Sequence, residues 1–149
     1  MTDSTASLTP EDRERLDISV VNLYVILNGE QRPENEIDDY AAFYKAVLES
    51  PQLTTTSQPS IGDFMEVYGP LLDAGKEIVS LHLSGAISGT CEAARQAAAQ
   101  LEADGRGGER ITVVDSRTTA GGLALVFGGG LCIFGQWARG RVGVVVLRR

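Results

Sequence analysis

The fold is decided by the stretch Glu77-Ile-Val-Ser-Leu-His-Leu83, which is followed by the glycine-bearing loop Ser84–Gly89 and by an alanine-rich segment from Thr90 to about Asp104. The first part is rich in apolar and β-branched residues, which predicts a strand. The alanine-rich part predicts a helix. Ile111-Thr-Val-Val114 predicts the next strand. A strand, a helix and a strand in this order indicate a parallel sheet with a right-handed crossover.

Upstream of this unit, the sequence predicts another strand and a hairpin. Ile18–Leu27 is rich in β-branched and aromatic residues, and Asn28-Gly29 is a strong signal for a tight turn. Glu30–Arg32 is then expected to be a short return strand. Before them, Thr9 followed by Pro10 is typical of a helix start.

Two more helices are expected between the hairpin and Glu77. One begins around Ile37–Tyr40, and the other is capped by Ser60 with Asp63 three residues later, in the pattern of a capping box. Ala74-Gly75 should end the second helix, and Thr54–Ser60 reads as a polar loop. The sequence therefore predicts an α/β fold with a mostly parallel sheet flanked by helices.

Both ends of the chain depart from this pattern. No apolar strand precedes Thr2–Thr5, so we expect the chain to be truncated at its start. Residues 121–126 predict the opening of a further helix, but residues 126–149 are unusually rich in Gly, Arg and Val. A shifted reading frame is one explanation of this tail, and a flexible basic interaction segment is the other. We therefore expect an α/β lobe in residues 1–125, an atypical tail in residues 126–149 and no second lobe.

Composition excludes several classes of protein. In these 149 residues, Cys91 and Cys132 are too few for a disulfide framework, and the single His82 cannot build a histidine-rich metal centre. We expect no metal and no cofactor. There is no signal segment and no run of about 18 apolar residues, so a cytoplasmic protein is expected. The net charge of −7, with all 20 acidic residues at or before Asp115, disfavours nucleic acid as a partner.

Two hydroxyl-rich stretches are candidates for a binding site: Thr56-Ser57-Gln58-Pro59-Ser60 and Ser88-Gly89-Thr90. Each precedes a predicted helix, whose first backbone N–H groups and positive dipole end suit a carboxylate or phosphate. Ser88–Thr90 also follows a parallel strand, at the end where open α/β sheets bind ligands. Ser and Thr are equally the usual helix caps, so a purely structural role is the alternative.

Four motifs in this order resemble the DegV family: Thr2-Asp3-Ser4-Thr5; Thr56–Ser60 with Gly62 and Phe64; Leu83-Ser84 with Ile87–Thr90; and Val114-Asp115-Ser116-Arg117. The resemblance covers about residues 2–125. It implies the N-terminal lobe of a two-lobed bacterial protein that encloses one long-chain fatty acid. It also implies a non-catalytic, acyl-carrying role beside a separate ATP-binding fatty acid kinase subunit, with transient membrane contact possible for lipid exchange.

The resemblance also implies site residues. Thr56 and Ser88 match the positions that bind the fatty acid carboxylate, with help from the amides near Ser57 and Gly89. The supporting residues of the crevice loops are Asp3, Ser4, Thr90, Asp115 and Ser116. The family's basic or imidazole residue from the second lobe has no counterpart here, and Ser84-Gly85 lacks a second serine. We therefore expect this form to bind lipid weakly or not at all.

Other functions stay open at this point. A serine-dependent hydrolase or a phosphate-handling enzyme could use Ser88 or Asp3 on a similar scaffold, although no G-x-S-x-G elbow is present. A fragment without activity is a further possibility. His82 is expected to be structural or partly exposed, and Cys91 to be buried in its helix.

Overall fold

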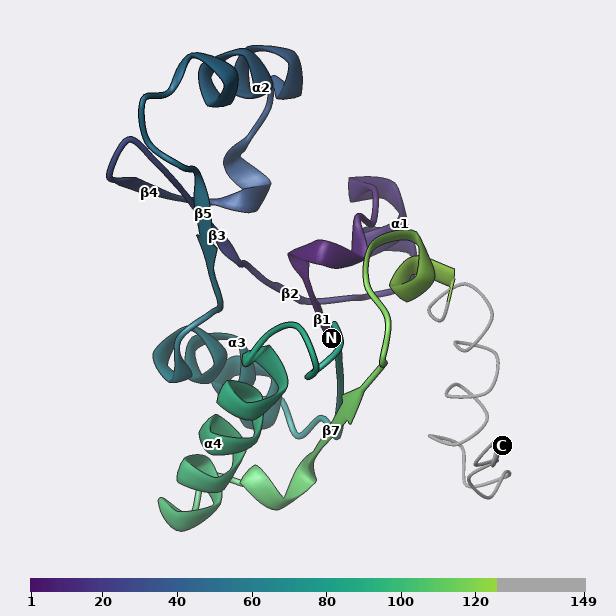
Figure 1. Ribbon diagram of the computed structural model, residues 1–149. Helices are drawn as coiled ribbons and strands as arrows, with labels where there is room; N and C mark the ends of the chain where they lie inside the picture. Colours follow the sequence, from purple (N-terminus) through teal and green to yellow (C-terminus); the bar gives the residue numbers. More distant parts are fainter. Residues whose placement is uncertain (126–149) are drawn as a thin grey trace.

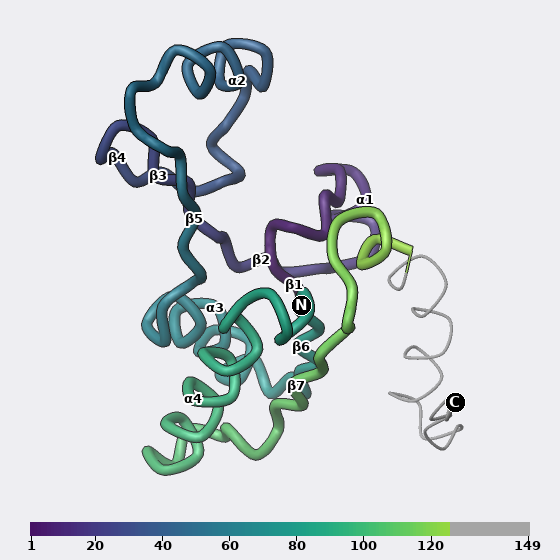
Figure 2. The backbone as a smooth tube through the Cα atoms, viewed as in Figure 1, coloured from purple at the N-terminus to yellow at the C-terminus, as the bar shows by residue number. Residues whose placement is uncertain are grey.

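A parallel sheet lies at the centre of the molecule, and the computed structural model describes residues 1–125 of it (Figure 1). Strand β6 (Ile78–His82) pairs in parallel with β7 (Ile111–Asp115), and β1 (Thr2–Asp3) pairs in parallel with β2 (Val20–Val21). The Met1 amine donates to the Val79 carbonyl (2.7 Å) and the Leu81 N–H to the Met1 carbonyl (3.1 Å). These bonds place the strands in the order β2-β1-β6-β7, and Figure 2 shows the N-terminus beside β6.

Two helices cover one side of β6 and β7. Helix α3 (Ile61–Asp73) begins with the capping box of Ser60 and Asp63, and α4 (Thr90–Ala103) forms the crossover from β6 to β7, with a short 3-10 turn at Gly108–Arg110. The core between helices and sheet is built from apolar residues of these elements, chiefly Phe64, Tyr68, Leu72, Ile78, Ala94, Ala97 and Leu101. The strand–helix–strand unit predicted from Glu77 onward is confirmed.

A smaller antiparallel sheet with one helix projects from this body (Figure 1). Its strand order is β4 (Glu30–Pro33), β3 (Tyr24–Leu27) and β5 (Thr55–Ser57). Helix α2 (Tyr40–Glu49) is capped by Asp39, which accepts a hydrogen bond from the Ala42 N–H, and the 3-10 turn Glu34–Glu36 precedes it. No residue of α2 is buried.

The remaining described elements flank β1. A 3-10 turn (Ser4–Ala6) follows β1 directly, and α1 (Pro10–Arg15) is capped by Thr9 as predicted. Residues 120–125 are helical, as expected, and Leu123 packs into a second apolar cluster with Leu81 and Leu83. The atypical tail lies outside the described residues.

Three expectations are wrong. Ile18–Leu27 is not one strand, because the Leu23 N–H donates to Ser4 Oγ (3.0 Å) and its carbonyl accepts the Glu34 N–H (2.8 Å), which separates β2 from β3. Thr54–Ser60 is not wholly a loop, since β-branched threonines in β5 pair with β3. Asp3 was expected in a loop, but Thr2–Asp3 forms β1, a strand that is too short to give a sequence pattern.

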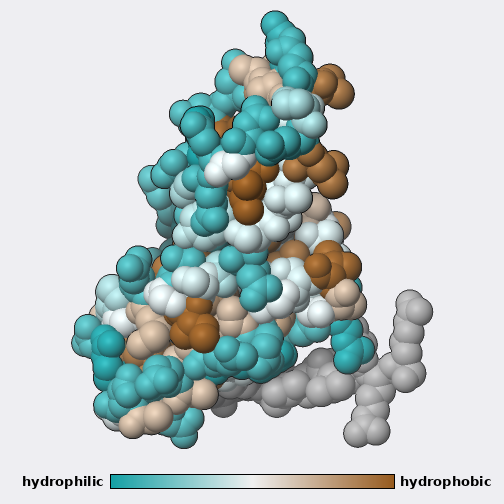
Figure 3. Space-filling model, turned by 60° about the vertical axis from the view of Figure 1, so that its left-hand side comes forward, coloured by the Kyte–Doolittle hydropathy of each residue, from teal (hydrophilic) through white to brown (hydrophobic). Residues whose placement is uncertain are grey.

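Apolar side chains also reach the surface in separate patches (Figure 3). Those with the largest exposed fractions are Leu53 (89%), Leu48 (86%), Leu125 (76%), Ile87 (66%) and Tyr44 (60%). In residues 1–125 no helix is long and apolar enough to cross a bilayer.

Candidate functional site

The two hydroxyl stretches meet at one hollow of about 440 Å³. Thr56 and Ser57 reach it from β5, which is held in place by its pairing with β3, and Ser88 and Gly89 reach it from the loop before α4. The other residues that line it are Thr5, Leu23, Tyr24, Val25, Glu34, Gln58, Leu83 and Ile87. Residues more than 30 positions apart in the sequence therefore present hydroxyl groups to the same space.

A close approach between Gln58 and Gly89 joins the two stretches. A Cβ atom on Gly89 would overlap the side-chain amide of Gln58, so only glycine lets this amide lie against the α4 N-terminus. The N-cap residue of α4, Gly89, has no side chain to cap the helix, and only the Thr90 N–H is bound, by Ser88 Oγ, whereas α3 is capped by Ser60. The first N–H groups of α4 are therefore better placed than those of α3 to meet an anion.

Ser88 and Thr90 form a pair at this helix start. Their hydroxyl groups lie 2.8 Å apart, and the Thr90 N–H donates to Ser88 Oγ at 3.3 Å. Thr90 is fully buried and Ser88 is half-buried. Thr90 thus contacts Ser88 without lining the hollow itself.

Asp3 and Ser4 lie behind the hollow. They line a neighbouring space of about 600 Å³ instead. Asp3 is fully buried and accepts hydrogen bonds from the N–H groups of Thr5 (3.1 Å) and Leu83 (2.9 Å). Burial alone would raise the pKa of Asp3, but the hydrogen bonds from His82, Thr5 and Leu83 outweigh it and lower the pKa below its ordinary value.

Ser4 connects two walls of the hollow. Its hydroxyl donates to Glu34 Oε2 (2.6 Å) and accepts the Leu23 N–H (3.0 Å). Both Glu34 and Leu23 line the hollow. Ser4 therefore acts on the site through these two residues, from a place outside it.

Asp115 and Ser116, at the end of β7, do not line the hollow. Asp115 accepts the Arg117 N–H (2.8 Å) and faces Gly85, where a Cβ would come within 3.0 Å of its carboxylate. Ser116 Oγ donates to the Thr118 carbonyl (3.2 Å). The glycine in Ser84-Gly85 thus leaves room for Asp115.

The charge around the hollow is unusual for an anion site. None of its twelve lining residues is Lys, Arg or His, and Glu34 is the single charged one. All donors offered to a ligand are therefore hydroxyl, amide or backbone N–H groups. Such a site orients a carboxylate without forming an ion pair with it.

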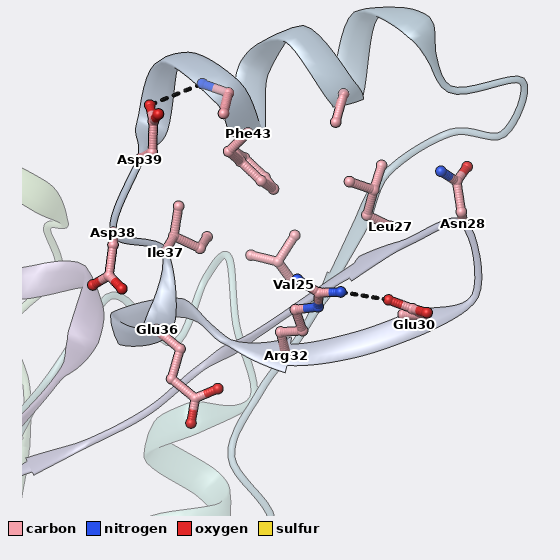
Figure 4. A pocket seen from close by; sticks show the side chains of 12 residues that line it. Val25, Leu27, Asn28, Glu30, Arg32, Glu36, Ile37, Asp38, Asp39 and Phe43 are labelled. Carbon is pink, nitrogen blue, oxygen red and sulfur yellow. Dashed lines mark hydrogen bonds and ion pairs between the residues drawn. The ribbon is translucent and has the colours of Figure 1, made fainter.

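A third cavity, of about 510 Å³, lies between α2 and the antiparallel sheet (Figure 4). Val25, Leu27, Ile37 and Phe43 point into it. Its rim carries four acidic residues, and its one arginine, Arg32, is paired with Glu30 at 2.6 Å. This cavity contains none of the predicted carboxylate-binding residues, and its acidic rim disfavours an anion.

The described residues do not support serine catalysis. Ser88 Oγ faces Thr90, and both ring nitrogens of His82 are occupied elsewhere, by Ser80 (2.6 Å) and Asp3 (3.0 Å). Ser80, His82 and Asp3 have the connectivity of a Ser-His-Asp triad, but all three are fully buried, so no substrate can reach Ser80 Oγ.

Cys91 is buried as expected, and burial together with Asp115 raises the pKa of its thiol. In residues 1–125 no cluster of His, Cys, Asp or Glu is arranged to hold a metal ion.

Sequence reasoning missed several lining residues. Thr5, Gln58 and Glu34 line the hollow, yet none of them was named as a site residue, although Thr5 and Gln58 each lie inside a motif. The position of Gln58 between two hydroxyl residues and Pro59 was a usable signal. Glu34 gave none, because its placement depends on the bond to Ser4, thirty residues away.

Known proteins share both the sequence and the fold. The family model described as "Uncharacterised protein, DegV family" matches residues 1–127. A DegV domain-containing protein of Listeria monocytogenes is 41% identical over 125 residues, which are 83% of this chain and 42% of that protein. The DegV family protein from Thermus thermophilus, whose structure shows fatty acid binding, is 34% identical. Its TM-score is 0.79, over 95% of this chain and 47% of that one.

DegV from Bacillus subtilis, a fatty acid-binding protein, is 32% identical with a TM-score of 0.73, and the match covers 90% of this chain and 46% of that one. The chain thus spans about half the length of the solved structures it matches, and somewhat less of the curated relatives.

Proposed function

The chain belongs to the DegV family, and from this premise we propose that it binds a long-chain fatty acid by the carboxylate. The observation that carries the proposal is the hollow shared by Thr56, Ser57, Ser88 and Gly89. Thr56 and Ser88 donate their hydroxyl protons to the carboxylate, and the amides near Ser57 and Gly89 assist. Similar proteins from Thermus thermophilus and Bacillus subtilis bind fatty acids.

The chemistry of the hollow fits this ligand. A carboxylate taken out of water needs several donors, because leaving it unpaired would be very costly. The hollow offers hydroxyl and amide donors, with Leu23, Val25 and Ile87 as apolar neighbours. These apolar side chains suit the first carbons of an acyl chain.

We further propose that the bound acid is carried and presented rather than converted by this chain. Neutral donors hold the carboxylate without an ion pair, so one oxygen stays available to a separate ATP-binding kinase subunit that phosphorylates it. We expect weak binding by the chain as it stands, since Glu34, the only charged residue among the described residues that line the hollow, repels the ligand.

Nuclear magnetic resonance with carboxyl-labelled myristate tests the site even at low affinity. The Thr56 and Ser88 amides should shift on titration and the labelled carboxyl should move with them. Thr56→Val and Ser88→Ala should each lower affinity by about 10- to 100-fold, the range for losing one hydrogen bond to a charged group. Mass spectrometry of lipid extracted from the purified protein then identifies the natural ligand.

Matched controls are available on the same elements. Thr55→Val changes an exposed threonine of β5 that does not line the hollow, and Ser84→Ala removes a hydroxyl that accepts the Ala86 N–H in the same loop as Ser88. Both controls should bind myristate normally. If the controls weaken binding as much as the site variants, or if the Thr56 and Ser88 amides do not respond to myristate, the proposal is wrong.

A further inference from the structure

We propose that His82 is a positioning residue: through a buried chain of hydrogen bonds ending at Asp3, it fixes the two walls of the hollow formed by Thr5 and Leu83. The chain runs from Tyr68 on α3 through Ser80 and His82 on β6 to Asp3 on β1. Its links measure 2.7 Å (Tyr68 Oη to Ser80 Oγ), 2.6 Å (Ser80 Oγ to His82 Nε2) and 3.0 Å (His82 Nδ1 to Asp3 Oδ2).

Every member of this chain is fully buried. Water therefore cannot replace a missing link, and each donor and acceptor must be satisfied within the protein. Phe64 packs edge-on against the His82 ring, with centroids 5.1 Å apart, and holds the ring in its plane. The imidazole thus has one orientation and two fixed partners.

The direction of every hydrogen bond follows from Asp3. An ionised carboxylate only accepts, so His82 must carry its proton on Nδ1 and donate it to Asp3. His82 Nε2 is then an acceptor, Ser80 donates to it, and Ser80 in turn accepts the Tyr68 hydroxyl proton. Burial lowers the pKa of His82 and raises the pKa of Tyr68 to about 12, which keeps the ring neutral and the phenol protonated.

Asp3, the last residue in this chain of hydrogen bonds, contacts the walls of the hollow. Asp3 Oδ1 accepts from the N–H and hydroxyl of Thr5, and Asp3 Oδ2 accepts from the Leu83 N–H as well as from His82. Thr5 and Leu83 both line the hollow, and Leu83 leads directly into the loop that carries Ser88. Without the His82 proton, the Asp3 carboxylate loses a partner and its hold on both walls loosens.

Two substitutions separate this role from simple packing. The side-chain amide nitrogen of asparagine lies where His82 has Nδ1, so His82→Asn keeps a donor for Asp3 and gives up the link to Ser80. The amide of glutamine lies where His82 has Nε2, so His82→Gln keeps a partner for Ser80 and gives up the donor to Asp3. Both replace an aromatic ring by an amide and so disturb packing against Phe64 to a similar degree.

The measured quantities are the pKa of Asp3 and the exchange rates of the Thr5 and Leu83 amides, all by nuclear magnetic resonance. His82→Gln should raise the pKa of Asp3 and speed both amides by about tenfold or more, the size expected for losing one charge-assisted hydrogen bond. His82→Asn should leave the pKa of Asp3 and the exchange rates of both amides near their values in the unsubstituted protein. Equal effects of the two variants would show that His82 only packs.

A measurement on the unsubstituted protein decides the matter if a variant does not fold. Nitrogen resonances of the His82 ring should show the proton on Nδ1, and a proton on Nε2 would overturn the inference. Its consequence for lipid binding rests on the proposed function: His82→Gln should weaken myristate binding about tenfold more than His82→Asn. If the unsubstituted protein binds no myristate, the proposed function fails while the tautomer and the Asp3 measurements still test the positioning role.

Discussion

Replacing Asp3 by asparagine tests how much of the fold depends on a carboxylate buried beneath the hollow. Asp3 is fully buried and accepts hydrogen bonds from both the N–H and the hydroxyl of Thr5, from the Leu83 N–H and from the His82 ring. All four groups donate to it. Asparagine has the same shape but offers one oxygen and one NH₂ group. Its NH₂ group, a hydrogen-bond donor, must therefore lie opposite groups that are also donors.

The expected loss in free energy of unfolding follows from this mismatch. Whichever way the amide turns, the backbone N–H of either Thr5 or Leu83 is left unpaired, at a cost of about 1–3 kcal/mol. The bonds that remain also lose the assistance of the charge. We expect the free energy of unfolding to fall by about 3 kcal/mol in total. In a protein of this size, 1 kcal/mol corresponds to roughly 2–4 °C, so Tm should fall by roughly 6–12 °C.

Thermal unfolding followed by circular dichroism at pH 7.5 measures this change. Asp12→Asn is the matched control, because Asp12 is an exposed aspartate paired with Arg15 at 2.6 Å, and its loss should leave Tm essentially unchanged. A shift for Asp3→Asn no larger than that of the control would refute the reasoning, since it would mean that the buried donors find other partners at no cost.

The difference between the two proteins should also depend on pH in one direction. The pKa of Asp3 is lowered in the folded state from its ordinary value of 3.8. Its contribution to stability is therefore fully present above pH 3.8 and is lost as the pH falls through the lower folded value. The stability gap between unsubstituted protein and Asp3→Asn should close in acid. A gap that widens in acid would contradict the ionised state of Asp3.

Three further outcomes are expected. Because burial lowers the pKa of His82, the unfolded chain takes up a proton there that the folded chain does not. Stability should then be lost as the pH falls below about 6.5. Urea unfolding between pH 7 and 5 should show this fall in the free energy of unfolding, and His82→Asn should remove the part that comes from His82. The variant should keep any contribution of the Met1 amine, because burial lowers the pKa of that amine to about 6. Ser60→Ala breaks the capping box with Asp63 and should lower the free energy of unfolding by about 1 kcal/mol in the same assay. Glu34→Gln removes the acidic charge at the hollow and should tighten myristate binding by roughly 2- to 5-fold, as for a screened pair of like charges; unchanged affinity would place Glu34 too far from the ligand.

Local chemistry made part of the fold predictable. Thr9 and Ser60 cap α1 and α3 as their sequence context indicates, and the β6–α4–β7 unit follows from apolar runs with a helical segment between them. Strands β1 and β5 were missed because strands of two or three residues exist only through their long-range partners, β2 and β3. Such pairing leaves no periodic pattern in the sequence.

Helix α2 shows a different limit. Its apolar residues recur at helical spacing, which predicts the helix correctly but also suggests a buried face. In the structure Tyr44 is 60% exposed and Leu48 is 86% exposed, because α2 stands over a small sheet away from the main core. Periodicity therefore indicates that a segment is helical, while what covers the helix is a property of the whole fold.

The candidate site, too, could be predicted from the sequence only in part. Thr56 and Ser88 were singled out as hydroxyl groups before helices, and the structure brings them to one hollow. Asp3 was expected only to border the crevice, and its role as an acceptor for Thr5 and Leu83 could not be read from the sequence. Hydrogen bonds that join residues about 80 positions apart, as between Leu83 and Asp3, are fixed by topology alone.

The positions of the two carboxylates, Asp3 below the hollow and Glu34 beside it, bear directly on how a fatty acid would be held. Asp3 is fully satisfied by its own donors and only fixes the walls, so it contributes no attraction to a ligand. Glu34 repels an anion, and the donors at Thr56 and Ser88 are neutral. Burial of the acyl chain, at about 25 cal/mol per Å², must then supply a large part of the affinity, while the hydroxyl and amide groups bind the carboxylate and set where it points. A site built in this way should discriminate strongly between chains of different length, and it should bind tetradecanol, which lacks the carboxylate, more weakly than myristate. Affinities for decanoate, myristate and tetradecanol would show whether this ranking holds.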